Sequence, residues 1–116
     1  MKIVIFNEDL RSEMQMYLAL SNHYDVTIAE SEDDLLQLLD RNSPDYTFLD
    51  LETGEANPNR HSRFEIANLI RSKHPDTKVV GICDAKENCV SDAAAHGINR
   101  TVTRPIKNRE LLDLIG

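Results

Sequence analysis

The sequence predicts an α/β protein built on a parallel sheet with helices on both faces. Five short runs of apolar and β-branched residues alternate with longer segments whose apolar residues repeat at helical spacing. A parallel pair of strands needs a crossover connection, and a helix between successive strands supplies it. The 116 residues are enough for one domain with its own core. We therefore expect a single (βα)5 domain over residues 1–116.

Five segments have the composition of buried strands. Each is four to seven residues long, is rich in Val, Ile, Thr, Tyr or Phe, and is bounded by polar or turn-forming residues. The first apolar run is too short for a signal peptide or a membrane span. In chain order the expected strands are 2–6 (KIVIF), 25–29 (DVTIA), 45–50 (DYTFLD), 77–83 (TKVVGIC) and 100–103 (RTVT).

Five helices are expected between and after these strands. Ser31 and Asp34 have the spacing of a capping box before the second helix, and Pro44 prevents that helix from continuing. Gly97 suits the C-terminal cap of the fourth helix, which is rich in small residues. In chain order the expected helices are 9–21, 31–42, 63–73, 86–96 and 107–115.

The charge of the chain is unevenly distributed. The formal net charge of −7 argues against nonspecific binding to nucleic acid. Residues 1–55 carry 13 acidic and 3 basic side chains, whereas residues 56–116 carry 7 and 10. This excess of acid has two interpretations, solvated helix faces or an acidic pocket that binds a cation. Cys83 and Cys89 lie in no CxxC or Cys/His cluster, so we expect reduced thiols in a cytosolic protein.

Polar side chains follow the strands at the edge where a doubly wound sheet binds ligands. They are Asn7, Glu8 and Asp9 after the first strand, Asp50 after the third, Cys83 and Asp84 after the fourth, and Arg104 after the fifth. Neighbouring carboxylates of Glu8 and Asp50 need a proton or a cation between them, and an all-oxygen site suits Mg²⁺. An ionised Asp50 can attack a phosphoryl group, with Arg104 as the neutralising cation. The alternative is that Asp50 and Arg104 form only a structural ion pair.

The whole chain resembles the receiver domain of bacterial two-component response regulators. The matching segments are KIVIFNED (2–9), PDYTFLDLE (44–52), HPDTKVVGIC (74–83) and AAAHGINRTVTRPI (93–106). The resemblance implies a flavodoxin-like, doubly wound parallel sheet of strand order 2-1-3-4-5. It also implies that Asp50 is the phosphoacceptor, that Arg104 replaces the family lysine, and that the bond before Pro105 is cis. Mg²⁺ would be held by Glu8, Asp50, the carbonyl oxygen of Glu52 and, through water, Asn7.

Several residues depart from the family pattern. Asn7 replaces an acid, Glu8 replaces an Asp, and Thr101 replaces the aromatic residue that usually switches. Cys83 stands where a Thr or Ser normally hydrogen-bonds the phosphoryl group, and a thiol is a weak donor. Asp84 would repel a phosphoryl group if it faced the site. Compared with the family, segment 54–63 contains an insertion of about five residues. The insertion is either a functional lid or a tolerated lengthening of a surface loop.

These residues are compatible with three functions. The first is a receiver in a His-Asp phosphorelay, phosphorylated on Asp50 with Mg²⁺ by a histidine kinase or phosphotransfer protein and switching a downstream protein partner. The second is a degenerate pseudo-receiver, a protein-interaction module independent of phosphorylation. The third, a flavodoxin-like enzyme or cofactor binder, is less favoured because a glycine-rich phosphate loop and Trp are missing. We expect a cytoplasmic, non-enzymatic monomer or weak homodimer that binds neither nucleic acid nor membrane.

Overall fold

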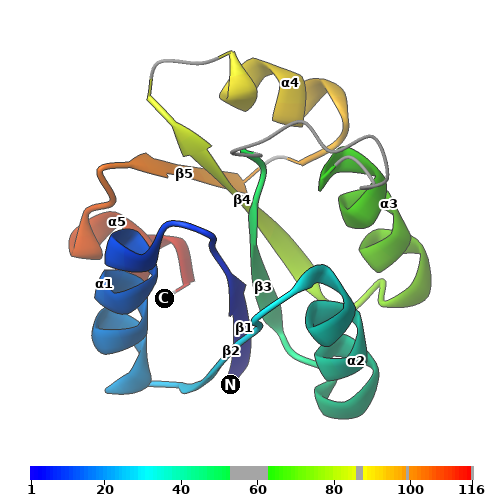
Figure 1. Cartoon of the computed structure of the whole chain (residues 1–116), viewed down its shortest axis with the longest axis horizontal. Coiled ribbons are helices and arrows are strands. Elements are labelled where there is room, and N and C mark those ends of the chain that lie inside the picture. The colour runs from blue at the N-terminus through cyan, green and yellow to red at the C-terminus, as the bar shows by residue number, and fades with distance from the viewer. Residues whose placement is uncertain (53–62, 86–87, 99, 116) are drawn as a thin grey trace.

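The computed structural model describes residues 1–52, 63–85, 88–98 and 100–115, and these residues contain one parallel five-stranded sheet. The strand order is β2-β1-β3-β4-β5, as predicted (Figure 1). The strands are β1 (Lys2–Phe6), β2 (Asp25–Ile28), β3 (Tyr46–Asp50), β4 (Lys78–Asp84) and β5 (Arg100–Arg104). The helices are α1 (Leu10–Ser21), α2 (Glu32–Asn42), α3 (Arg63–Lys73), α4 (Cys89–Ala95) and α5 (Asn108–Ile115).

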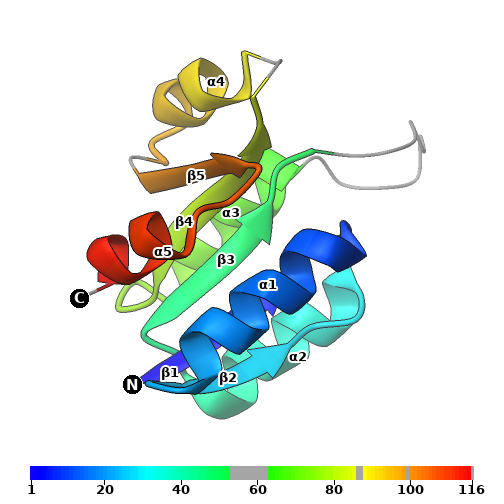
Figure 2. The same cartoon turned by 90° about the vertical axis from the view of Figure 1, so that its left-hand side faces the viewer.

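Helices cover both faces of the sheet, which gives three layers (Figures 1 and 2). Side chains alternate along β1, so that Ile3 and Ile5 join the core beneath α1 and α5, and Val4 and Phe6 join the core beneath α2, α3 and α4. All five residues of the central strand β3 are buried. The continuous apolar character of this strand therefore reflects a sheet that is buried on both sides.

The predicted elements agree closely with the observed ones. The fourth helix is shorter than expected, because its described part begins at Cys89, and residues 86 and 87 lie outside the described residues. The Ser31 hydroxyl caps α2 by accepting from the Asp34 backbone N–H at 3.0 Å. The reciprocal contact differs from a standard capping box, because the Asp34 carboxylate accepts from the backbone N–H of Glu30. Among the helices that the structure describes, none has the length and apolar composition needed to cross a membrane.

The strand register aligns the polar ends of the strands at one edge, called here the carboxyl edge. Leu49 pairs with Phe6, Asp50 pairs with Ile82 on β4, and Asp84 pairs with Arg104 on β5. The Arg104–Pro105 peptide bond that follows β5 is cis, which confirms the prediction for Pro105. The candidate residues named from the sequence are therefore brought together by the pairing of β1, β3, β4 and β5.

Candidate functional site: a charged pocket at the carboxyl edge

Asp50 is the buried centre of the pocket, with 2 % of its surface exposed. One carboxylate oxygen, Oδ2, accepts from the backbone N–H of Glu8 at 3.0 Å and pairs with Nη2 of Arg104 at 2.7 Å. The other, Oδ1, accepts from the backbone N–H of Glu52 at 2.9 Å. Burial raises the pKa of Asp50, while Arg104 and the two backbone donors partly oppose that rise. The carboxylate is thus held in one orientation by donors from three segments.

Arg104 connects three parts of the carboxyl edge. Besides its contact with Asp50, it donates from Nη1 to Oδ1 of Asp84 at 2.8 Å and from Nη2 to Oδ1 of Asn7 at 2.8 Å. Burial alone would lower the pKa of Arg104, but the carboxylates of Asp84 and Asp50 raise it. Asp84 does line the pocket, and its charge is paired with the arginine. The fork geometry of a guanidinium allows these contacts at once, which a lysine ammonium at this position would not reproduce.

Arg63, the first residue of α3, is the functional candidate that the sequence did not reveal. It is 1 % exposed, and its Nη2 donates to Oε1 of Glu8 at 2.7 Å. Nη1 donates to the backbone carbonyl of Asp50 at 3.2 Å, and Nε lies 3.2 Å from Oε1 of Glu32. The guanidinium also stacks over the ring of Phe6, 4.6 Å from its centroid. A second buried cation therefore contacts Glu8 and the backbone of Asp50, two residues that are expected to bind the metal ion.

Asn7 and Asp9 shape the pocket from the β1 side. The Asn7 amide donates to the Ser12 hydroxyl at 2.8 Å, so its oxygen faces Arg104 and the backbone N–H of Asp9. Asp9 is the N-cap of α1 and accepts from the backbone N–H of Ser12 at 3.2 Å. The hydrogen bond with Ser12 lowers the pKa of Asp9. Asn7 thus holds Arg104 in place, and its side-chain oxygen already accepts hydrogen bonds from two donors, Arg104 and the backbone N–H of Asp9.

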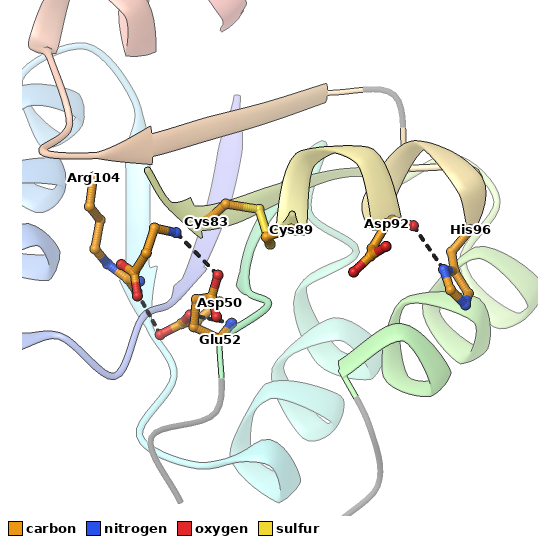
Figure 3. Close-up of a disulfide and its surroundings, with 8 residues drawn as sticks. Asp50, Glu52, Cys83, Cys89, Asp92, His96 and Arg104 are labelled. Carbon is orange, nitrogen blue, oxygen red and sulfur yellow. Dashed lines mark hydrogen bonds and ion pairs between the residues drawn. A yellow bond between two sulfur atoms is a disulfide. The ribbon is translucent and has the colours of Figure 1, made fainter. Parts of the chain in front are cut away.

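Cys83 and Cys89 form a disulfide in the structure, so the prediction of reduced thiols is wrong (Figure 3). The spacing of the two cysteines matches no short metal or redox motif, but the connection from β4 to α4 brings their Cα atoms to 5.7 Å, within the range for a disulfide. Cys83 lies in the hydrophobic core beneath α2, α3 and α4 and is not among the residues that line the pocket. A disulfide sulfur also carries no hydrogen, so in this state Cys83 cannot donate to a phosphoryl group. The carboxylate of Glu52 lies beside both sulfurs, with the ligand atoms of all three residues within 4.8 Å.

The open pocket around Asp50 has a volume of about 490 Å³. The side chains that line it determine whether a divalent cation fits. The carboxylates of Glu8 and Asp50 offer oxygen ligands of the type that Mg²⁺ prefers, so the residue types fit the ion. Arg63 competes for Glu8, and Arg104 competes for Asp50 and Asn7. Pocket-lining residues are Glu8, Asp9, Asp50, Glu52, Asp84 and Arg104, whereas segment 54–62 lies outside the described residues.

The comparisons with known proteins identify the family. The family model for the response regulator receiver domain matches residues 3–116, and the chain belongs to this family. The receiver domain of NtrX from Brucella abortus is similar, with a TM-score of 0.84 and 20% identity over 97% of this chain and 93% of that one. The signal receiver domain of a two-component response regulator from Bacteroides fragilis has a TM-score of 0.83 and 21% identity over 97% and 90%.

The chain corresponds to only part of some similar proteins. It covers 25% of the Brucella abortus NtrX chain that was crystallised with ADP, with a TM-score of 0.84 and 18% identity. No curated protein sequence matches the chain. These likenesses establish the receiver fold, and the chemistry of the pocket has to be argued from the residues of this chain.

Proposed function

We propose that this receiver domain accepts a phosphoryl group on Asp50 from a histidine kinase or a phosphotransfer protein. The observation that carries the proposal is the arrangement of Asp50 and Arg104. The carboxylate is fixed by two backbone N–H groups, and the guanidinium lies 2.7 Å from its Oδ2 at the wall of an open pocket. An oriented carboxylate beside a fixed positive charge is what phosphoryl transfer to aspartate requires.

In the transfer step, a carboxylate oxygen of Asp50 forms a bond to phosphorus as the bond from phosphorus to the donor's imidazole nitrogen breaks. The electron pair of that bond stays with the imidazole. Arg104 stabilises the negative charge on the phosphoryl oxygens, and the Glu8 and Glu52 N–H groups keep the carboxylate in position. Bound Mg²⁺ would supply further charge neutralisation. Glu8, Asp50 and the carbonyl oxygen of Glu52 would hold the ion, and Asn7 would contribute through water.

The added charge on Asp50 would switch the binding of a downstream protein partner. A phosphoryl group competes with the carboxylates of Asp50 and Asp84 for Arg104, which also anchors β5 to Asn7. The switch therefore acts on the equilibrium between two arrangements of the β5 end. We further propose that the domain is a cytoplasmic signalling module and not an enzyme, that it contacts neither nucleic acid nor membrane, and that it is a monomer or weak homodimer.

The competing proposal is a degenerate pseudo-receiver that binds its partner without phosphorylation. Two observations favour it, the pairing of Glu8 with Arg63 and the absence of a thiol hydrogen on disulfide-bonded Cys83. The deciding experiment is intact-mass analysis after incubation with acetyl phosphate, with and without Mg²⁺. A gain of one phosphoryl group that Asp50→Asn abolishes supports the phosphorelay receiver. Absence of the gain, together with an unchanged amide spectrum under beryllofluoride and Mg²⁺, supports the pseudo-receiver.

A further inference from the structure

The disulfide joins the end of β4 to the first residue of α4, beside the phosphoacceptor pocket (Figure 3). Cys83 is 0% exposed and Cys89 is 7% exposed, so both belong to the core under α2, α3 and α4. Cys89 is the more accessible of the pair. A small thiol from solution would therefore reach the bond at Cys89, and attack there would release the thiol of Cys83.

The residues on either side of Cys83 are hydrogen-bonded to the segment that follows Asp50. The carbonyl of Ile82 accepts from the backbone N–H of Leu51 at 3.0 Å. The backbone N–H of Asp84 donates to Oε1 of Glu52 at 3.2 Å, and Glu52 in turn donates its backbone N–H to Asp50. A change in the position of Cys83 is thus transmitted to the acceptor through Glu52. The disulfide and the acceptor share one hydrogen-bonded unit.

The disulfide also holds the start of α4. This helix has only seven residues, and its N-cap, Asn88, makes no side-chain capping hydrogen bond. Helices this short are unstable in isolation, so their order depends on tertiary contacts. The buried residues of α4 are Cys89 at its start and Ala93 in its middle, and at its C-terminal cap the ring of His96 stacks on Phe64. The bond at Cys89 is therefore a major constraint on where α4 begins.

We propose that Cys83 and Cys89 form a reversible redox-modification site that couples the thiol–disulfide balance of the surroundings to the Asp50 pocket. Two thiols lose two electrons and two protons as the sulfur–sulfur bond forms. A low-molecular-weight disulfide takes up both, and its own bond breaks to give two thiols. The exchange passes through a mixed disulfide at Cys89. A low-molecular-weight thiol drives the reverse reaction.

The two redox states differ in what they offer the acceptor. The oxidised state fixes the start of α4 and leaves Cys83 without a hydrogen. The reduced state loosens α4 and releases that constraint on the chain of hydrogen bonds from Asp84 through Glu52 to Asp50. The effect on phosphorylation rests on the proposed function, whereas the redox chemistry and the change in α4 do not.

The first test measures the redox site without phosphorylation. The protein is equilibrated with oxidised or reduced glutathione and analysed by alkylation, intact mass and hydrogen exchange. We expect the oxidised form to resist alkylation and to be lighter by two hydrogen atoms, and the reduced form to exchange faster in α4. Cys89→Ala should show the faster α4 exchange in both buffers. Alkylation of both cysteines in oxidised glutathione, or identical α4 exchange in both buffers, would overturn the proposal.

The second test measures the initial rate of Asp50 labelling by acetyl phosphate in the two redox states. The Glu52 backbone N–H that orients the Asp50 carboxylate makes one hydrogen bond, worth about 1 kcal/mol, so the labelling rates of the two forms should differ by up to about fivefold. Cys89→Ala keeps Cys83 and should label at the same rate in both buffers. Equal rates for the wild type in both buffers would overturn the coupling. If no form is labelled, the proposed function fails, and the redox site is decided by the first test alone.

Discussion

Arg63→Met removes both contributions of the buried arginine, the contact that holds Glu8 and the positive charge beside the pocket. Methionine matches the arginine side chain as far as Nε, and its thioether can still contact the ring of Phe6, although the guanidinium that stacks on that ring is lost. It removes the 2.7 Å contact with Glu8, the 3.2 Å contact with Glu32 and the bond to the Asp50 carbonyl. We expect the variant to be less stable than the wild type and to bind Mg²⁺ more tightly.

The loss of stability depends on how deeply the partners of Arg63 are buried, and the gain in Mg²⁺ affinity depends on the repulsion that is removed. Removing one member of a buried ion pair costs about 3–5 kcal/mol, but Glu8 and Glu32 are 31% and 18% exposed and can turn toward water. We therefore expect a loss of about 1–3 kcal/mol in the free energy of unfolding. A divalent ion on Glu8 would lie about 5 Å from the guanidinium, where repulsion amounts to about 1–2 kcal/mol even at the dielectric constant of water. Affinity for Mg²⁺ should rise about tenfold.

Isothermal titration calorimetry with Mg²⁺ measures the affinity, and urea denaturation measures the stability. Lys73→Met is the matched control, because it removes one positive charge from the exposed end of the same helix. Arg63→Lys keeps the charge and should not gain affinity to the same extent. If Arg63→Met binds Mg²⁺ no more tightly than Lys73→Met, Arg63 does not compete with the ion, and the electrostatic account of the pocket is wrong.

Three further predictions concern stability, each measured by urea denaturation. The raised pKa of Asp50 means that the free energy of unfolding falls as pH rises from its ordinary value of 3.8 through the folded-state pKa, and Asp50→Asn should lack this decrease. Cys89→Ala should lose about 2 kcal/mol relative to the oxidised protein and match the reduced protein, whereas a variant as stable as the oxidised protein would refute a stabilising disulfide. Gly81→Ala should lose about 1–3 kcal/mol, because its Cβ would lie 2.5 Å from Cδ1 of Leu51, and a near-neutral result would show that Leu51 moves aside easily.

The fold could be predicted because local patterns and the global topology agree in this chain. Each strand is a short apolar run, and each helix carries apolar residues at helical spacing, so the alternation alone implies a parallel sheet. The exact ends of the strands are harder to predict, because contacts across the sheet decide them. Asp84 extends β4 by one residue beyond the prediction, because it pairs with Arg104 across the sheet.

The site was predictable where strand ends determine it and unpredictable where tertiary contacts do. Asp50, Arg104 and Asp84 meet because their strands end at one edge. Arg63 gave no comparable signal, because an arginine before a helical apolar pattern is normally a solvated residue. Its burial depends on Glu8 and Glu32, which are 55 and 31 positions earlier in the chain, and on the ring of Phe6. The disulfide was missed for the same reason, since only the β4–α4 connection brings its cysteines together.

The two unexpected features, buried Arg63 and the disulfide, lie on the same side of Asp50 and involve the starts of three helices. Glu32, Arg63 and Cys89 are the first residues of α2, α3 and α4, the helices that cover one face of the sheet. Glu32 pairs with Arg63, Arg63 contacts the Asp50 carbonyl, and Cys89 is bonded to Cys83. On the opposite face the pocket reaches α1 through Asn7 and Ser12. We therefore expect a change in charge at Asp50 to reach the starts of α2 and α3 through Arg63, and the start of α4 through Glu52, the end of β4 and the disulfide.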